Sequence, residues 1–293
     1  MWRLIALLLF ASRAFAVQPL ADVPLIGNDH RPRIIADING HRGVECLFDT
    51  GSTAGVIGRD IARGADRIGL ARIRTANTTI GIPEVLVHDV AIGGAHARDV
   101  EFVQRDSSWF GHGGSMPCII GLSFANHFVV DLDGRAHRLR LFPPGTDVRA
   151  VLDPAQRDGA EIKVAFDGDG ISTDVLVDGI GVHSHIDSGW GYVTPNQALL
   201  DRLGYRHDDP RFFVRQIQES DSGRIVDMRL VKFPSVQLGN VRVLDVVGDA
   251  DLDRDYFALV RRQPGLYMQI GWPLLSDHRF VFDARARRAA FVP

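Results

Sequence analysis

The 293-residue sequence predicts an all-β protein in which one chain forms two similar lobes. Valine, isoleucine, phenylalanine and threonine recur in short runs, and the 30 glycines punctuate them, a pattern typical of many short strands. Hydrophobic residues make up 45% and charged residues 24% of the chain, as in ordinary globular proteins. At about 100–200 residues per domain, this length accommodates two compact units.

The first 16 residues are expected to be a signal peptide. A positive charge at Arg3 precedes an apolar stretch over residues 4–10, and Ala14-Phe15-Ala16 fits a cleavage site. The stretch is shorter than the about 20 residues that a membrane span needs, although an uncleaved anchor is the alternative. We therefore expect a mature protein that begins near Val17, has no membrane span, and is periplasmic or secreted.

The chain is expected to divide near its middle. Pro143-Pro144-Gly145 interrupts regular structure, and further turn-forming residues follow between Asp153 and Gly159. A linker over residues 143–160 is therefore predicted between an N-terminal lobe (17–150) and a C-terminal lobe (151–293). The net charge of −3 gives no basic surface of the kind that binds nucleic acid.

The two halves repeat four sequence features in the same order, which chance rarely produces. Each half begins with a turn and a strand that leads into Asp-Thr-Gly or Asp-Ser-Gly. A short run that ends in glycine follows, and then a four-residue segment with glycine in its third position. A pair of strand-like segments comes last. In order, the paired segments are 38–52 and 177–190, 90–93 and 236–239, 119–122 and 269–272, and 128–141 and 280–291.

Helices are predicted to be few. The clearest candidate runs from Pro195 to Leu203, with Thr194 as the N-cap and Gly204 after its end.

Asp49 and Asp187 are the candidate catalytic residues, because each follows an apolar strand and begins one of the repeated turns. Two carboxyl groups in contact do not both ionise easily, so they share one proton. The ionised carboxylate can then take a proton from water while the protonated one donates to a substrate carbonyl. One aspartate from each lobe would build such a site where the lobes meet.

The residues that follow each aspartate suit this role. Gly51 and Gly189 leave room for backbone N–H groups to approach the carboxylates. Thr50 and Ser188 carry hydroxyls that are expected to hydrogen-bond between the lobes and hold the turns in register.

The pattern resembles the pepsin and retropepsin group of aspartic proteases, which place Asp-Thr/Ser-Gly in each of two lobes or subunits, with an apolar-apolar-Gly strand crossing behind it. Phe48-Asp49-Thr50-Gly51-Ser52 with Ile119-Ile120-Gly121 matches closely, and Ile186-Asp187-Ser188-Gly189 with Ile270-Gly271 matches less closely. The details are most similar to bacterial retropepsin-like proteins, with two such domains fused in one chain. The resemblance extends from about residue 33 to the end.

The resemblance implies two acid-protease-like β-barrel lobes with a cleft between them, and an endopeptidase that cleaves a peptide or protein substrate without a cofactor or metal. It implies hairpin flaps at Thr75–Glu84 and Gln216–Asp227. Because one chain contains both turns, a monomer is expected. The implied site residues are Asp49 and Asp187 as the catalytic pair, with Thr50, Gly51, Ser52, Ser188 and Gly189 in support.

Cys46 and Cys118 lie three residues before Asp49 and Gly121, on strands that are neighbours in the resembling fold, so the resemblance allows a disulfide between them. Two buried thiols are the alternative.

Two departures from the family pattern support a second hypothesis for the function. Trp190 stands where the family has a small residue or a hydroxyl, and Gln269 replaces an apolar residue. The alternative function is therefore a catalytically inactive peptide-binding or scaffold protein that retains the fold.

A metal site is a further alternative reading of the second turn. His183 and His185 alternate along one strand with Asp187, an arrangement that suits zinc. This reading leaves the repeated turn at Asp49 unexplained, so we expect no metal.

Overall fold

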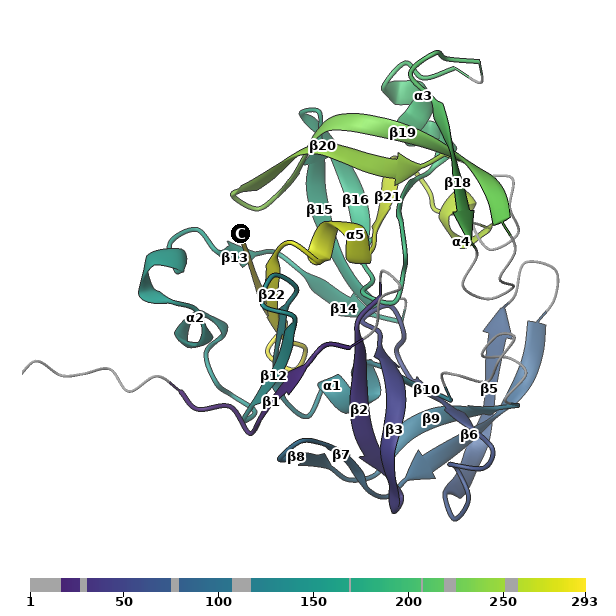
Figure 1. Cartoon of the computed structure of the whole chain (residues 1–293), viewed down its shortest axis with the longest axis vertical. Helices are drawn as coiled ribbons and strands as arrows, with labels where there is room; N and C mark the ends of the chain where they lie inside the picture. The colour runs from purple at the N-terminus through teal and green to yellow at the C-terminus, as the bar shows by residue number, and fades with distance from the viewer. Residues whose placement is uncertain are drawn as a thin grey trace, which may run out of the picture.

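The computed structural model describes residues 17–26, 31–74, 79–106, 117–168, 170–206, 208–218, 225–250 and 258–293. Strands dominate this part of the chain and the helices are short, which confirms the predicted all-β fold (Figure 1). The predicted signal peptide lies outside the described residues. The division into units at residue 150 remains a prediction, and we use "N-terminal half" and "C-terminal half" for residues 17–150 and 151–293.

Strands of the N-terminal half form a nine-stranded sheet within the described residues, in the order β5-β6-β9-β4-β10-β3-β2-β7-β8. Strand β2 alternates between buried and more exposed residues, with Ile34, Ala36 and Ile38 facing the core, whereas β4, β7 and β10 are buried throughout. The strands are β2 (Arg33–Ile38), β3 (His41–Phe48), β4 (Gly55–Gly58), β5 (Asp66–Arg74), β6 (Thr79–Val87), β7 (Val90–Ile92), β8 (Ala95–Ala97), β9 (Val100–Arg105) and β10 (Cys118–Ile120).

The C-terminal half forms a second, eight-stranded sheet within the described residues, at the opposite end of the molecule in Figure 1. Its main path runs β17-β21-β16-β15-β19-β18, while β14 pairs with β15 and β20 pairs with β19. The strands are β14 (Ala165–Asp167), β15 (Gly170–Val177), β16 (Ile180–Ile186), β17 (Val193–Pro195), β18 (Phe213–Gln218), β19 (Ile225–Leu238), β20 (Val241–Asp249) and β21 (Tyr267–Ile270).

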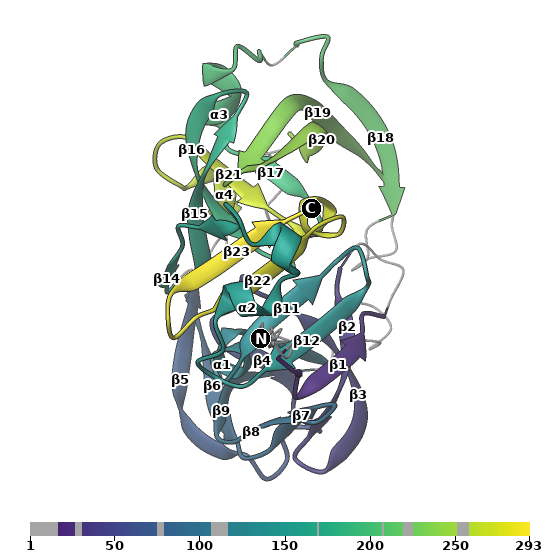
Figure 2. The same ribbon diagram turned by 90° about the vertical axis from the view of Figure 1, so that its left-hand side faces the viewer.

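A six-stranded sheet combines both halves and lies between the other two sheets (Figures 1 and 2). Its central pair is β11 with β22, in which Val130 lies opposite Phe282. These two residues occupy equivalent positions in the sequence repeat, as expected of a local two-fold axis between them. The strands, in sheet order, are β1 (Ala21–Pro24), β12 (Arg138–Phe142), β11 (Val129–Asp133), β22 (Arg279–Asp283), β23 (Arg288–Val292) and β13 (Glu161–Ile162).

A buried ionic cluster connects the halves in this sheet. Asp131 on β11 is fully buried and accepts two hydrogen bonds from the guanidinium of Arg279 on β22, at 2.8 and 2.7 Å. Arg140 on β12 donates a third, at 3.0 Å. A buried carboxylate with several charge-assisted hydrogen bonds fixes the register of the strands that carry them.

The sequence repeat is also visible in the backbone. The turn before β3 has φ of 49° at Asn39 and 82° at Gly40, and the turn before β16 has the same values at Asp178 and Gly179. Two successive residues with positive φ form the tight hairpin turn that favours Asn-Gly and Asp-Gly. The two aspartate-bearing strands therefore begin from the same local geometry.

The helices of the described residues are one or two turns long: α1 (Leu122–Ala125), α2 (Val148–Val151), α3 (Gln197–Arg202), α4 (Ala258–Arg261) and α5 (Trp272–Leu275). The predicted start of the third was wrong. Pro195 ends β17 opposite Met268, and Asn196 is the N-cap, accepting a hydrogen bond from the N–H of Leu199. Pro195 is therefore a strand residue, although its local sequence also suits the first position of a helix.

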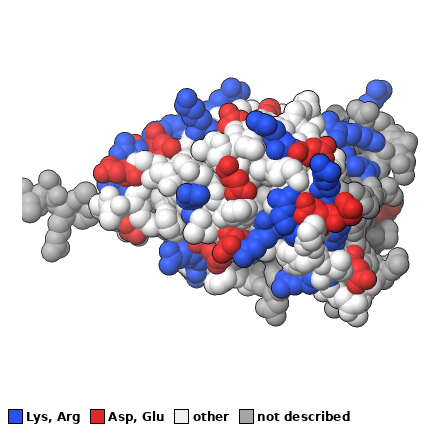
Figure 3. All heavy atoms as spheres, turned by 90° about the horizontal axis from the view of Figure 1, so that it is seen from above, with Lys and Arg blue, Asp and Glu red and all other residues white. Residues whose placement is uncertain are grey.

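Positive and negative side chains lie intermixed on the face shown in Figure 3. In the described part of the chain, no helix is long and apolar enough to cross a membrane.

Candidate active site

Each aspartate follows a strand that pairs in parallel with a second strand. Strand β3 runs parallel to β10, with Phe48 opposite Ile120, and β16 runs parallel to β21, with Ile186 opposite Ile270. The N–H of Asp49 donates to the carbonyl of Ile120 at 2.9 Å, and the N–H of Asp187 makes the corresponding bond to Ile270 at 2.9 Å. Each aspartate is thus fixed where its strand ends, against the strand that crosses behind it.

Hydroxyl groups connect the two turns. Oγ1 of Thr50 donates to the carbonyl of Ile186 at 2.8 Å and accepts from the N–H of Ser188 at 2.9 Å. Oγ of Ser188 donates to the carbonyl of Phe48 at 2.7 Å and accepts from the N–H of Thr50 at 3.1 Å. Both side chains are buried, so these four reciprocal bonds satisfy backbone groups that water does not reach.

Each glycine of the turns faces the carboxyl group of the opposite turn. A Cβ atom on Gly51 would overlap the carboxyl of Asp187, and one on Gly189 would overlap the carboxyl of Asp49. Gly51 also donates its N–H to Oδ1 of Asp49 at 2.9 Å. Only residues without a side chain permit this approach, which brings Asp49 and Asp187 (the carboxyl pair) within hydrogen-bonding reach of each other.

Both members of the carboxyl pair have raised pKa values. Burial raises the pKa of Asp49, against the hydrogen bonds that it accepts from Asp187 and from backbone N–H groups. Burial and the negative charge of Asp49 raise the pKa of Asp187 well above its usual value. Oδ1 of Asp187 is buried without a hydrogen-bond donor in good geometry, and a proton shared with Asp49 would satisfy it.

Ser52 and Trp190, which follow the glycine of each turn, both direct their polar groups away from the carboxyl pair. The hydroxyl of Ser52, an expected supporting residue, donates to the carbonyl of Ala54 at 2.6 Å. At the equivalent position of the other turn, the indole N–H of Trp190 donates to Oγ1 of Thr194 at 2.9 Å. Both polar groups are therefore directed at neighbours other than the carboxyl pair.

Gln269 supplies a contact that the sequence did not predict. Its side-chain Nε2 donates to Oδ2 of Asp187 at 2.8 Å, and its Oε1 accepts from the hydroxyl of Tyr267. The Tyr267 hydroxyl also lies 3.0 Å from Nδ1 of His185. The sequence signal was a glutamine in an otherwise apolar run, but its partners follow only from the pairing of β16 with β21.

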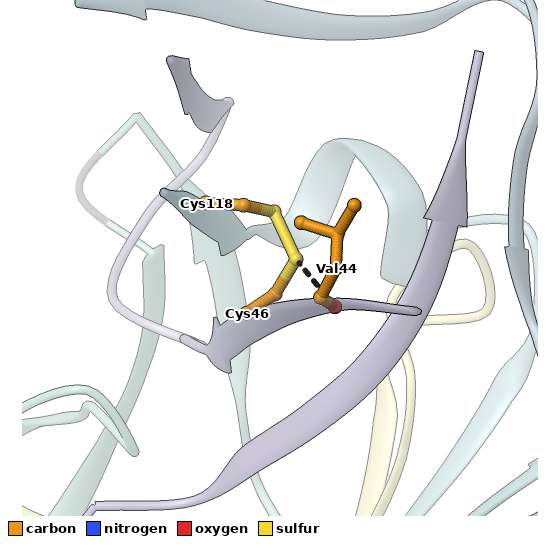
Figure 4. Close-up of a disulfide and its surroundings, with 3 residues drawn as sticks. All are labelled: Val44, Cys46 and Cys118. Atoms are coloured by element: carbon orange, nitrogen blue, oxygen red, sulfur yellow. Dashed lines mark hydrogen bonds between the residues drawn. A yellow bond between two sulfur atoms is a disulfide. The ribbon is translucent and has the colours of Figure 1, made fainter. Parts of the chain in front are cut away.

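A disulfide joins Cys46 on β3 to Cys118 on β10, with both side chains fully buried (Figure 4). The two residues lie opposite each other in the parallel ladder. The bond therefore ties the strand that carries Asp49 to the strand behind it.

The histidines considered as zinc ligands have other partners. His183 lies 3.4 Å from Asp174, and His185 contacts Tyr267. Among the described residues, no group of three or more histidine, cysteine, aspartate or glutamate side chains is arranged to hold a metal ion.

The two predicted flaps are described in part. Strands β5 and β6 form one hairpin and β18 and β19 the other. Residues 75–78 and 219–224, which connect these strands in the sequence, lie outside the described residues.

Residues 34–124 match the family model of aspartyl proteases. This match supports an aspartic protease family. The matched stretch contains Asp49 and both cysteines, and it ends before the C-terminal half. It therefore supports a general aspartic protease function, while the role of Asp187 depends on the geometry above. No curated protein matches the chain significantly.

Proposed function

We propose that the protein is an aspartic endopeptidase that hydrolyses peptide bonds with a water molecule activated between Asp49 and Asp187. The observation that carries the proposal is the pairing of two half-buried carboxyl groups, one from each half, held by the four reciprocal bonds of Thr50 and Ser188. Such a pair retains one proton over a range of pH in which a single carboxyl would lose it.

The chemistry follows from that shared proton. The ionised carboxylate accepts a proton from water as the water oxygen bonds to the peptide carbonyl carbon, and the protonated carboxyl donates its proton to the carbonyl oxygen. The resulting tetrahedral diol breaks its C–N bond as the amide nitrogen receives a proton from one carboxyl and a diol hydroxyl gives its proton to the other, which re-forms the C=O bond. Two shorter peptides leave, and the carboxyl pair again holds one proton.

The location of the protein and the nature of its substrate belong to the proposal. The expected signal peptide motivates a periplasmic or secreted protein, and the partly described hairpins motivate an extended peptide or protein substrate that binds as an added strand. Because both aspartates come from one chain, a monomer suffices to build the site.

Digestion of a mixed peptide library, read by mass spectrometry at several pH values, tests the proposal. Wild-type protein is expected to cleave, with loss of cleavage in Asp49→Asn and in Asp187→Asn. The matched control is Asp153→Asn, which alters an exposed aspartate of the predicted linker and is expected to leave cleavage unchanged.

The variants should fold, because asparagine retains the shape of aspartate. Cleavage that persists in both site variants would refute the carboxyl pair as the catalytic group. Binding of peptides without cleavage by folded wild-type protein at every pH would instead favour the inactive binding protein that Trp190 suggested.

A further inference from the structure

The two aspartates make the same backbone bonds to the strands behind them but differ in their side-chain contacts. Gln269 on β21 donates its side-chain N–H to Oδ2 of Asp187. The equivalent residue on β10 is Ile119, which packs in an apolar cluster with Leu47 and Val56. Among the described residues, an uncharged side-chain amide therefore contacts only one of the two carboxyls.

Tyr267 and His185 fix the orientation of the Gln269 side-chain amide. Because Oε1 of Gln269 accepts from the hydroxyl of Tyr267, the NH₂ group points at Asp187. The Tyr267 hydroxyl is placed in turn by Nδ1 of His185 at 3.0 Å. Tyr267 and His185 are both buried, so this chain of contacts has little freedom to rearrange.

We propose that Gln269 is a positioning residue that holds Oδ2 of Asp187, so that the pair loses its shared proton at a lower pH than it would without this donor. The inference rests on the proposed function, because it assigns a role within the same site. An N–H donor stabilises a carboxylate over the neutral acid. The Gln269 contact accordingly lowers the pKa of Asp187, against the larger upward effects of burial and of Asp49.

The other titratable groups of this network are unchanged by substitution of Gln269. Asp49 after β3 acts directly on Asp187, and Arg31 before β2 acts on Asp49. On the side of Gln269 lie Tyr267 on β21 and His185 on β16. Comparing variants at position 269 therefore isolates the effect of Gln269 on the pH at which the carboxyl pair loses its proton, because these other groups stay the same.

Gln269→Ile tests the proposal, because it gives the C-terminal half the residue that the N-terminal half already has. The basic limb of the pH profile of kcat/KM is expected to move up by about one pH unit, the size expected for one lost hydrogen bond to a charged group. We expect kcat to fall with KM little changed, since the amide donates its hydrogen bond to the carboxyl of Asp187.

Two further variants separate positioning from packing. Tyr267→Phe removes only the hydroxyl that orients the amide, and is expected to move the basic limb in the same direction by a smaller amount. Met268→Leu is the matched control, because Met268 is a fully buried neighbour on the same strand, and it is expected to leave the limb in place. An unmoved limb in Gln269→Ile, or an equal movement in Met268→Leu, would overturn the proposal.

Thermal unfolding against pH gives a readout that does not require cleavage. A carboxyl with a raised folded pKa retains a proton that the unfolded chain loses, so its contribution to stability falls as the pH rises from the unfolded value to the folded value. In Gln269→Ile this decline should extend about one pH unit higher, and the extension should vanish in an Asp187→Asn background.

The two readouts separate the inference from the proposed function. If the wild type cleaves nothing but the unfolding profile of Gln269→Ile shifts, the inference about the carboxyl pair stands and the protease proposal fails. If the wild type cleaves but neither profile moves in Gln269→Ile, the protease proposal stands and the inference is overturned.

Discussion

The hydrogen bonds between the two turns allow a quantitative prediction for Ser188→Ala. The hydroxyl of Ser188 donates to the carbonyl of Phe48 at 2.7 Å and accepts from the N–H of Thr50 at 3.1 Å, and the serine is fully buried. Alanine would leave both backbone groups buried without partners, at about 1–3 kcal/mol each. We therefore expect the free energy of unfolding to fall by about 2–6 kcal/mol, a large part of the 5–15 kcal/mol typical of a domain.

Urea unfolding of Ser188→Ala and Thr50→Val measures this cost. The matched control is Thr173→Val, since Thr173 is also buried but its hydroxyl donates one bond, to the carbonyl of Lys163 at 2.7 Å, away from the turns. The control should lose about 1 kcal/mol. Because both turn hydroxyls belong to one network, the double variant should cost less than the sum of the single variants.

The result that would refute this reasoning is a loss in Ser188→Ala no larger than that in Thr173→Val. Such a result would mean that the backbone groups of the turns find other partners, and that the hydroxyls do not hold the carboxyl pair together.

Three further predictions concern the disulfide, the buried ionic cluster and the carboxyl group of Asp187. Replacing Cys46 and Cys118 by alanine removes a bond across 72 residues, and unfolding in urea should show a loss of about 4 kcal/mol, with sensitivity to reductant also abolished; a loss near zero would contradict the loop-closure argument. Arg279→Met leaves the buried Asp131 without its principal partner and should cost about 3–5 kcal/mol, most of it recovered by adding Asp131→Leu; equal single and double costs would be inconsistent with this assignment. Asp187→Asn should raise the melting temperature at pH 7 and leave it unchanged at pH 3, because the folded state favours the neutral carboxyl; an equal change at both pH values would count against a raised pKa.

The features that the sequence predicted well are those encoded locally and repeated. Asn39-Gly40 and Asp178-Gly179 specify the same hairpin turn wherever they occur, and each then leads into an apolar strand ending in aspartate. The repetition of such segments is what allowed the fold class and the two aspartates to be chosen from the sequence.

The features that escaped prediction depend on which strands become neighbours. Asp131 meets Arg279 only because β11 pairs with β22 across the two halves, 148 residues apart in sequence. Pro195 lies in a strand because β17 pairs with β21, and this pairing outweighs the local preference of proline for the first turn of a helix. Neither strand pairing can be predicted from the local sequence.

The differences between the halves carry information that the repeat itself does not. A site assembled from two identical subunits must present the same residues to both carboxyls, whereas one chain with two turns can vary each side separately. Here Ile119 on one side is matched by Gln269 on the other, and Ser52 by Trp190, so that among the described residues only Asp187 receives a hydrogen bond from a side-chain amide. The reciprocal bonds of Thr50 and Ser188 bring the carboxyls together, and the amide of Gln269 acts on one carboxyl alone and so sets the pH at which the pair loses its shared proton.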